Sequence, residues 1–183
     1  VLQSFQVVLQ FLNENAIQKL HLKLLPKMYH LGPSDEMDYL LFLLKADMQK
    51  RETLSVIDQT KKIKIASNRL EGVKRGSKHQ LIIKEEATFE GFWNTILKVN
   101  LYKKHGAKPV HSLQEIETLK HKFPKQIRQF NVYHSDELVA GTTIFESKNV
   151  AHCQYISANE HKSIIGSLDF LHHHLITNVF KDK

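Results

Sequence analysis

Cysteine is nearly absent from this chain, since Cys153 is the only one among 183 residues. An internal disulfide is therefore excluded, and the single thiol fits a reducing compartment, so we expect a cytoplasmic protein. Long apolar runs are also missing: none reaches the length of a membrane span, and no secretory signal is visible. We find neither a low-complexity tract nor a short internal repeat.

The content of charged and apolar residues is typical of an ordinary globular protein, and the net charge is positive. The chain is 42% hydrophobic and 25% charged, which is enough to build a core without disulfides or metal. Lysine and arginine exceed the acidic residues, and the formal net charge is +7. This balance favours anionic partners such as nucleic acid, phosphorylated cofactors or acidic lipids, without choosing among them.

The first 58 residues alternate between helical and extended patterns. Residues 1–14 predict a helix whose apolar stripe contains Leu2, Phe5, Leu9 and Leu12. Residues 19–26 and 53–58 predict strands. Between them, residues 32–45 predict a helix with Ser34 as its N-cap.

The composition then changes to a strongly basic stretch at residues 61–78, which predicts an amphipathic helix. A strand at 80–86 follows, then a helix at 88–106 that Gly106 ends. A second helix at 111–123 begins with a capping box of Ser112 and Glu115. The apolar stripe expected for the basic helix consists of Ile63, Ala66, Leu70 and Val73.

Three strands separated by short turns come next, at residues 126–134, 137–146 and 150–157. The turns "SD" and "SKN" suit hairpins, so these strands predict an antiparallel meander. A helix from 163 to 180 closes the chain, with a stripe made of Ile164, Leu168, Leu171, Leu175 and Val179. The expected fold class is therefore α/β (α+β), a mixed and mainly antiparallel sheet flanked by helices.

From residue 80 onwards this order of elements resembles the first part of the GNAT acyltransferase fold. The amino-acid sequence resembles in particular the FemAB-like, or peptidoglycan-aminoacyltransferase-like, branch of that superfamily, which is found in bacteria. The segments that carry this resemblance are "YKKHGAKPVHSLQEIETLKHKFP" (102–124), "ELVAGTTIFESKNVAHCQYISANE" (137–160) and "GSLDFLHHHLI" (166–176). FemAB-like proteins have two GNAT-like halves. The resemblance thus implies the latter part of a first half at residues 1–58 and a second half, lacking its final strands, at 59–183.

The resemblance implies an acyltransferase that moves an acyl or aminoacyl group to an amine or hydroxyl acceptor. The donor is acetyl-CoA, another acyl-CoA, or aminoacyl-tRNA, and the acceptor is a small molecule or a cell-wall or surface-polysaccharide precursor. The alternative is a catalytically inactive GNAT-like module that binds tRNA or another polyanion through its basic residues. A third possibility is a homodimer formed through an exposed sheet edge.

The stretch "ANEHKSIIGSLDFLHHHLI" (158–176) contains the expected cofactor site. Its three consecutive histidines point about 100° apart on a helix and cannot hold one metal ion together, so no metal is expected. The start of the helix would offer free backbone amides to a phosphate, or it is simply capped by Ser163 or Ser167. The residues expected to bind the cofactor are Lys162, Ser163, Ile165, Gly166 and Ser167.

The meander supplies the candidates for catalysis. Strict alternation in the strand at 150–157 would place His152 and Gln154 on one face, and Cys153 and Tyr155 on the other. His152 is either a general base near neutral pH or a hydrogen-bonded histidine of the sheet. Tyr155 is either a proton donor to the leaving group or a packing residue. Glu146 is a second candidate base or a surface charge at a hairpin end.

A loop between two helices supplies the candidates for substrate binding. "HGAKPVH" contains His105, Lys108 and His111, which would contact an acidic acceptor or the phosphate of the donor. Gln154 joins them as a polar group on the neighbouring strand. The alternative is a solvated connector whose histidine interacts with a helix end.

Overall fold

The computed structural model describes residues 2–61 and 64–183. The chain divides into two compact units, of which the first ends at Val56 and the second begins at Ile57, close to the predicted boundary at residue 58. In the described part of the chain, no helix combines the length and the apolar character needed to cross a membrane.

The first unit contains the helix α1 (Leu2–Glu14), a short 3-10 turn η1 (Lys27–Tyr29) and the helix α2 (Glu36–Leu43). The helix predicted at 1–14 is confirmed, but α1 has no buried residue. Leu40 is the only buried hydrophobic residue among the described residues of this unit. The first unit therefore has very little core of its own.

The two strands predicted in the first unit, at residues 19–26 and 53–58, are wrong, because neither segment forms a strand. A strand is stable only when its backbone groups pair with a neighbour and one face is buried. The alternating leucines of the first segment stay more than 40% exposed. The pattern is that of a strand, but the described residues of the first unit provide almost no core on which it could pack.

The helix predicted at 32–45 is present as α2, but its predicted cap is wrong. Asp35 occupies the N-cap position, without a side-chain hydrogen bond to the helix. The hydroxyl of Ser34 donates instead to the Glu36 carboxylate. An acidic first turn therefore starts this helix in place of a serine cap.

The second unit is built on a four-stranded antiparallel sheet in the order β1-β2-β3-β4, so the fold is mixed α and β, as expected. The strands are β1 (Ile82–Glu86), β2 (Ile127–His134), β3 (Glu137–Glu146) and β4 (Ala151–Ala158). All four predicted strands of this region are confirmed. The turn between β2 and β3 has Ser135 and Asp136 at positive φ, which is the conformation of a tight hairpin.

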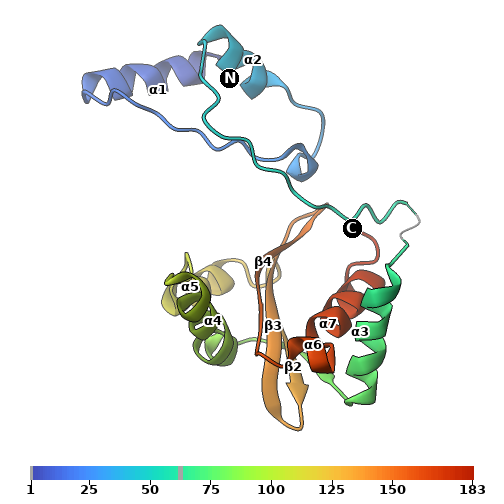
Figure 1. Ribbon diagram of the computed structural model, residues 1–183. Helices are drawn as coiled ribbons and strands as arrows, with labels where there is room; N and C mark the ends of the chain where they lie inside the picture. Colours follow the sequence, from blue (N-terminus) through green and yellow to red (C-terminus); the bar gives the residue numbers. More distant parts are fainter. Residues whose placement is uncertain (1, 62–63) are drawn as a thin grey trace. The chain divides into compact units, whose positions relative to one another are not determined.

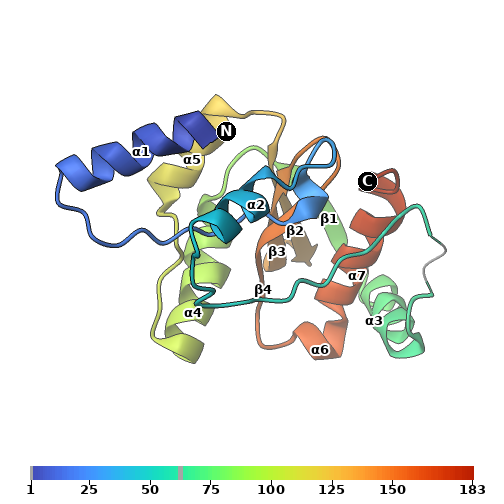
Figure 2. The same ribbon diagram turned by 90° about the horizontal axis from the view of Figure 1, so that it is seen from above.

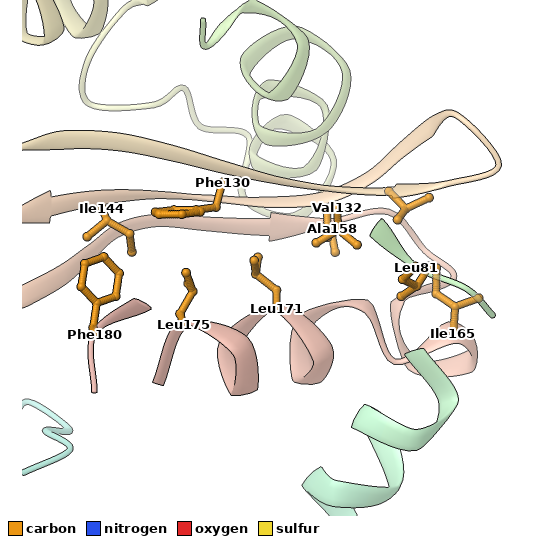
Figure 3. Packing of buried hydrophobic residues seen from close by; sticks show 11 residues of the cluster. Leu81, Phe130, Val132, Ile144, Ala158, Ile165, Leu171, Leu175 and Phe180 are labelled. Carbon is orange, nitrogen blue, oxygen red and sulfur yellow. The ribbon is translucent and has the colours of Figure 1, made fainter. Parts of the chain in front are cut away.

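One face of the sheet is covered by α6 (Lys162–Ile165) and α7 (Ser167–His174), and α7 continues into the π-helix η3 (Leu175–Val179). The helix α3 (Ser67–Lys78) packs against α7 on the side away from the strands (Figure 1). Figure 3 shows Phe130, Val132 and Ala158 of the sheet pointing towards Leu171 of α7 and Leu175 of η3. Leu81, Ile144, Ile165 and Phe180 complete this core. We call this side of the sheet the α7 face.

The opposite face is covered by the π-helix η2 (Phe92–Leu97), α4 (Lys98–His105) and α5 (Leu113–Lys122). The wider π turns direct two adjacent pairs of side chains inward, so that Phe92, Trp93, Ile96 and Leu97 are all buried. Gly106 ends α4 at φ 58°, and the capping box of Ser112 and Glu115 starts α5, both as predicted. We call this side the η2 face.

The basic helix is present as α3, but its predicted apolar stripe is wrong. Leu70 is exposed, and the buried residues of α3 are Gly72 and Gly76. Ile63 lies outside the described residues. Figure 2 shows α3 beside α7, and a side chain at Gly72 or Gly76 would come within 3 Å of Asp169 or Phe170. Glycine permits this close approach of two helices, which a search for apolar stripes does not detect.

The single helix predicted at 163–180 is also wrong in detail, because Gly166 divides it. Gly166 has φ +71°, ends α6 and precedes α7. The break turns α6 away from the axis of α7, and Ile164 of the predicted stripe is 64% exposed. Leu171 and Leu175 are buried, as the stripe predicted.

Candidate functional site

A hydrogen-bonded tyrosine and histidine lie on the η2 face, and they come from the predicted site residues. The phenol oxygen of Tyr155 in β4 lies 2.7 Å from Nδ1 of His111. The backbone N–H of His111 donates to the same oxygen at 3.1 Å. The structure therefore brings together one residue predicted from the meander and one predicted from the loop between α4 and α5. A phenol and an imidazole at this distance can exchange a proton.

This pair is fixed from two sides. The indole of Trp93 packs edge-on against the Tyr155 ring, with the centroids 4.8 Å apart, and its N–H donates to the His111 carbonyl at 3.3 Å. On the other side, the Asn100 amide of α4 donates to the Ser157 hydroxyl and to the Ala158 carbonyl. Both α4, through Asn100, and the end of the loop before α5, through His111, are thus attached to β4.

A β-bulge changes which residues of β4 share a face. Thr143 pairs with Tyr155, but the next residue, Ile144, pairs with Cys153, so Gln154 has no partner in β3. Residues directly opposite each other lie on the same face. Cys153 therefore packs on the α7 face, whereas Tyr155 packs on the η2 face.

The expectation that Cys153 and Tyr155 would share a face is consequently wrong, because strict alternation fails at a bulge. His152 pairs with Phe145, which packs against the cluster on the η2 face. His152 and Tyr155 therefore lie on the same side of the sheet. The His111 ring is 6.1 Å from the Phe145 ring, measured between centroids, so three predicted residues are gathered on one face.

Glu146 lies elsewhere, on the α7 face, in an ion-pair network. Its carboxylate accepts from Arg128 at 2.9 Å and lies 3.0 Å from the ammonium of Lys183. Burial alone would raise the pKa of Glu146, but hydrogen bonds from these two cations outweigh it and lower the pKa. The second predicted base is thus held as an ionised partner of Arg128, away from the pair of Tyr155 and His111.

The segment predicted to bind a cofactor has most of its amides already occupied. Ile164 and Ile165 donate their N–H groups to the His161 carbonyl, and Gly166 donates to Lys162. Ile165, Gly166 and Ser167 are buried. Lys162 and Ser163 are exposed. A phosphate at this segment would therefore meet these two side chains first, and the predicted amide cradle is largely engaged in the turns of α6.

The remaining predicted substrate residues lie on the surface. His105 is the last residue of α4, and Lys108 is exposed in the loop that follows. Gln154 is half-buried at the bulge. Two open depressions in the first unit, one of them lined by residues between Lys27 and Asp35, include none of the predicted site residues.

Sequence reasoning missed a buried row of polar side chains on the η2 face. Gln129, Asn131 and Thr143 are all 1% exposed or less. They hydrogen-bond to one another and, at the β1 edge, to Glu86. The signal was present, since polar residues recur at every second position of "QFNVY" (129–133). Polar residues at every second position are also typical of a strand face that is exposed to solvent, but in the structure η2 covers this face.

Neither a protein-family model nor a curated protein matches this chain.

Proposed function

We propose that this chain is a FemAB-like member of the GNAT superfamily and contributes to acyl or aminoacyl transfer onto an amine or hydroxyl. The observation that supports the proposal best is the bulge at Gln154 beside the pair of Tyr155 and His111. A bulge removes one residue from the ladder and leaves its backbone groups without a strand partner. A backbone N–H next to a proton-transfer pair is what stabilisation of a tetrahedral oxyanion requires.

In the proposed reaction the acceptor N–H or O–H attacks the carbonyl carbon of the donor. His152 removes the proton of the nucleophile as the new bond forms. The carbon–sulfur bond of a thioester, or the carbon–oxygen bond of a tRNA ester, then breaks. Tyr155 gives its proton to the leaving group and regains one through His111. The donor is acetyl-CoA, another acyl-CoA or aminoacyl-tRNA, and the acceptor is a small molecule or a cell-wall precursor.

Tyr155→Phe tests this role directly, because it removes the proton and leaves the ring that packs on Trp93. With acetyl-CoA as donor and hydroxylamine as a generic acceptor, we expect thiol release to fall at least about tenfold. The matched control is Tyr102→Phe, since Tyr102 is a tyrosine of α4 that is 74% exposed. The control should keep the full rate.

Two results would redirect the proposal. An unchanged rate in Tyr155→Phe would make Tyr155 a packing residue and leave the proton transfer to His152 alone. Absence of both saturable acetyl-CoA binding and thiol release would exclude acetyl-CoA as the donor and favour aminoacyl-tRNA or the non-catalytic alternative.

The alternative is a module that binds tRNA or another polyanion without catalysis, and α3 is the feature that favours it. Arg69 and Lys74 have side chains that are 68% and 73% exposed, although each contacts one carboxylate. Lys64 and Lys78 are exposed as well. These cations lie near one another on or beside a single helix.

If α3 binds a polyanion, the affinity for tRNA should fall steeply with salt, because each neutralised phosphate releases counterions. Lys74→Gln and Lys78→Gln together should reduce the slope of log affinity against log salt by about 2. The control pair is Lys103→Gln and Lys104→Gln in the last turn of α4. Equal slopes in both double variants would show that α3 is an ordinary solvated helix face.

A further inference from the structure

A continuous chain of side-chain hydrogen bonds crosses three strands on the η2 face and ends at Glu86 in β1. The Thr143 hydroxyl donates to the Gln129 side-chain carbonyl at 2.6 Å, and the Gln129 amide donates to the Asn131 carbonyl at 2.7 Å. The Asn131 amide then donates to Oε2 of Glu86 at 2.6 Å. The other oxygen, Oε1, accepts from the Tyr133 hydroxyl at 2.7 Å.

All of these hydrogen bonds run in the same direction, because in each of them the acceptor lies on the side nearer to Glu86. Aligned amide and hydroxyl dipoles polarise one another, and together they favour negative charge at the end of the chain. Both direct partners of Glu86 are donors, which suits an ionised carboxylate. Burial, followed by the hydrogen bond to Glu86, raises the pKa of Tyr133, so its hydroxyl keeps the proton that it donates.

Within the described residues, Glu86 forms no ion pair with a cation. Its neighbour Glu85, on the opposite face, is paired with Arg128 at 2.7 Å. A half-buried carboxylate that accepts one hydrogen bond on each oxygen has further lone pairs to offer a ligand.

A cation lies over the ring of Tyr133, the residue whose hydroxyl donates to Glu86. The ammonium of Lys84 lies 4.8 Å from the centroid of the Tyr133 ring, and Lys84 is exposed. The electron-rich face of a tyrosine attracts an ammonium group. The carboxylate of Glu86 and the Tyr133 ring thus favour a positive charge over this ring. The Lys84 side chain is flexible and can move away to make room for another cation.

We propose that Glu86, Asn131 and Tyr133 form a binding site for the ammonium group of an organic primary amine. Glu86 provides the negative charge and the lone pairs that accept from the ammonium group. Asn131 and Tyr133 hold the carboxylate in place through their hydrogen bonds. The ammonium of Lys84 competes with the ligand for this position. The site lies at the β1 edge, three strand spacings or about 14 Å from β4. It is therefore separate from the pair of Tyr155 and His111, and it does not depend on acyl transfer.

The test is a titration of the full chain with n-butylamine, followed by the NMR shifts of the Asn131 side-chain amide and the backbone of β1. The neutral isostere n-butanol serves as the ligand control. We expect saturable shifts with the amine alone. Glu86→Gln keeps the shape and removes the charge, so the affinity should fall at least about tenfold. The control Glu90→Gln changes an exposed carboxylate and should leave the affinity unchanged.

Lys84→Gln provides an independent readout, because removing the competing cation should tighten amine binding. Saturation that is equal for the amine and the alcohol would overturn the proposal, and so would equal affinity in Glu86→Gln and the unaltered chain. If Glu86→Gln disturbs the fold, Tyr133→Phe replaces it, since it removes one donor from the carboxylate and should also weaken binding. Failure of this site would leave the acyl-transfer proposal untouched, because Tyr155→Phe tests that proposal elsewhere.

Discussion

Gly166→Ala is expected to lower the free energy of unfolding of the second unit by about 4 kcal/mol. Two effects combine at this position. Gly166 has φ +71°, where a residue with a Cβ is destabilised by about 1–2 kcal/mol. A Cβ there would also lie 2.0 Å from the backbone carbonyl oxygen of Gly72, so α3 and α7 would have to separate.

Gly106→Ala is the matched control for the backbone effect. Gly106 has φ +58°, but a Cβ at this position would point into open space, with no other part of the described chain within 4 Å. The control should therefore show only the backbone penalty of about 1–2 kcal/mol. Trp93 is the only tryptophan and is fully buried in the second unit, so its fluorescence during urea unfolding reports on this unit.

Similar losses in the two variants would show that α3 and α7 can move apart at little cost in stability. A much larger loss for Gly166→Ala would establish the contact between the two helices as a main support of the α7 face. It would also show why Gly166 is a poor position at which to test cofactor binding. A change there acts on the packing of α3 whatever the segment binds.

The elements of the second unit could be predicted because local signals determine them. Gly106 marks a helix end through its left-handed backbone, and Ser112 with Glu115 marks a helix start through reciprocal hydrogen bonds. The prediction of a strand at 19–26 failed for the opposite reason. Its alternation is a local signal, but a strand forms only with a partner strand, and no local pattern supplies one.

The candidate site was predictable in its residue types but not in its arrangement. Tyr155 and His111 were each singled out, yet 44 positions separate them and nothing in the sequence paired them. The bulge at Gln154 reversed the expected face of Tyr155 relative to His152, because one unpaired residue shifts the alternation. The buried row ending at Glu86 was missed, since polar alternation looks the same whether water or η2 covers it.

Arg128→Met is expected to lower the free energy of unfolding at neutral pH by about 2 kcal/mol. The Arg128 guanidinium donates to both oxygens of Glu85, at 2.7 and 2.8 Å, and to Glu146. It also lies over the rings of Phe130 and Phe180, where methionine replaces part of the packing. The magnitude lies between that of exposed pairs and that of fully buried pairs, because the Arg128 side chain is 21% exposed.

This loss should depend on pH in a defined direction. The hydrogen bond from Arg128 lowers the pKa of Glu85 below the usual value of a glutamate carboxyl, although partial burial opposes it. A carboxyl with a lowered pKa in the folded state stabilises the fold above the pKa of the unfolded chain. That stabilisation is lost as the pH falls through the folded pKa. The difference between Arg128→Met and the unaltered chain should therefore be largest near neutral pH and shrink at acid pH.

Lys74→Met is the control, since the Lys74 and Glu71 pair is 3.0 Å long but its side chains are 73% and 59% exposed. Exposed pairs at this spacing on a helix contribute less than about 0.5 kcal/mol. Urea unfolding of both variants at neutral and acid pH, followed by Trp93 fluorescence, separates the two cases. A loss for Arg128→Met that is independent of pH would mean that its alkyl packing, and not its charge, stabilises the α7 face.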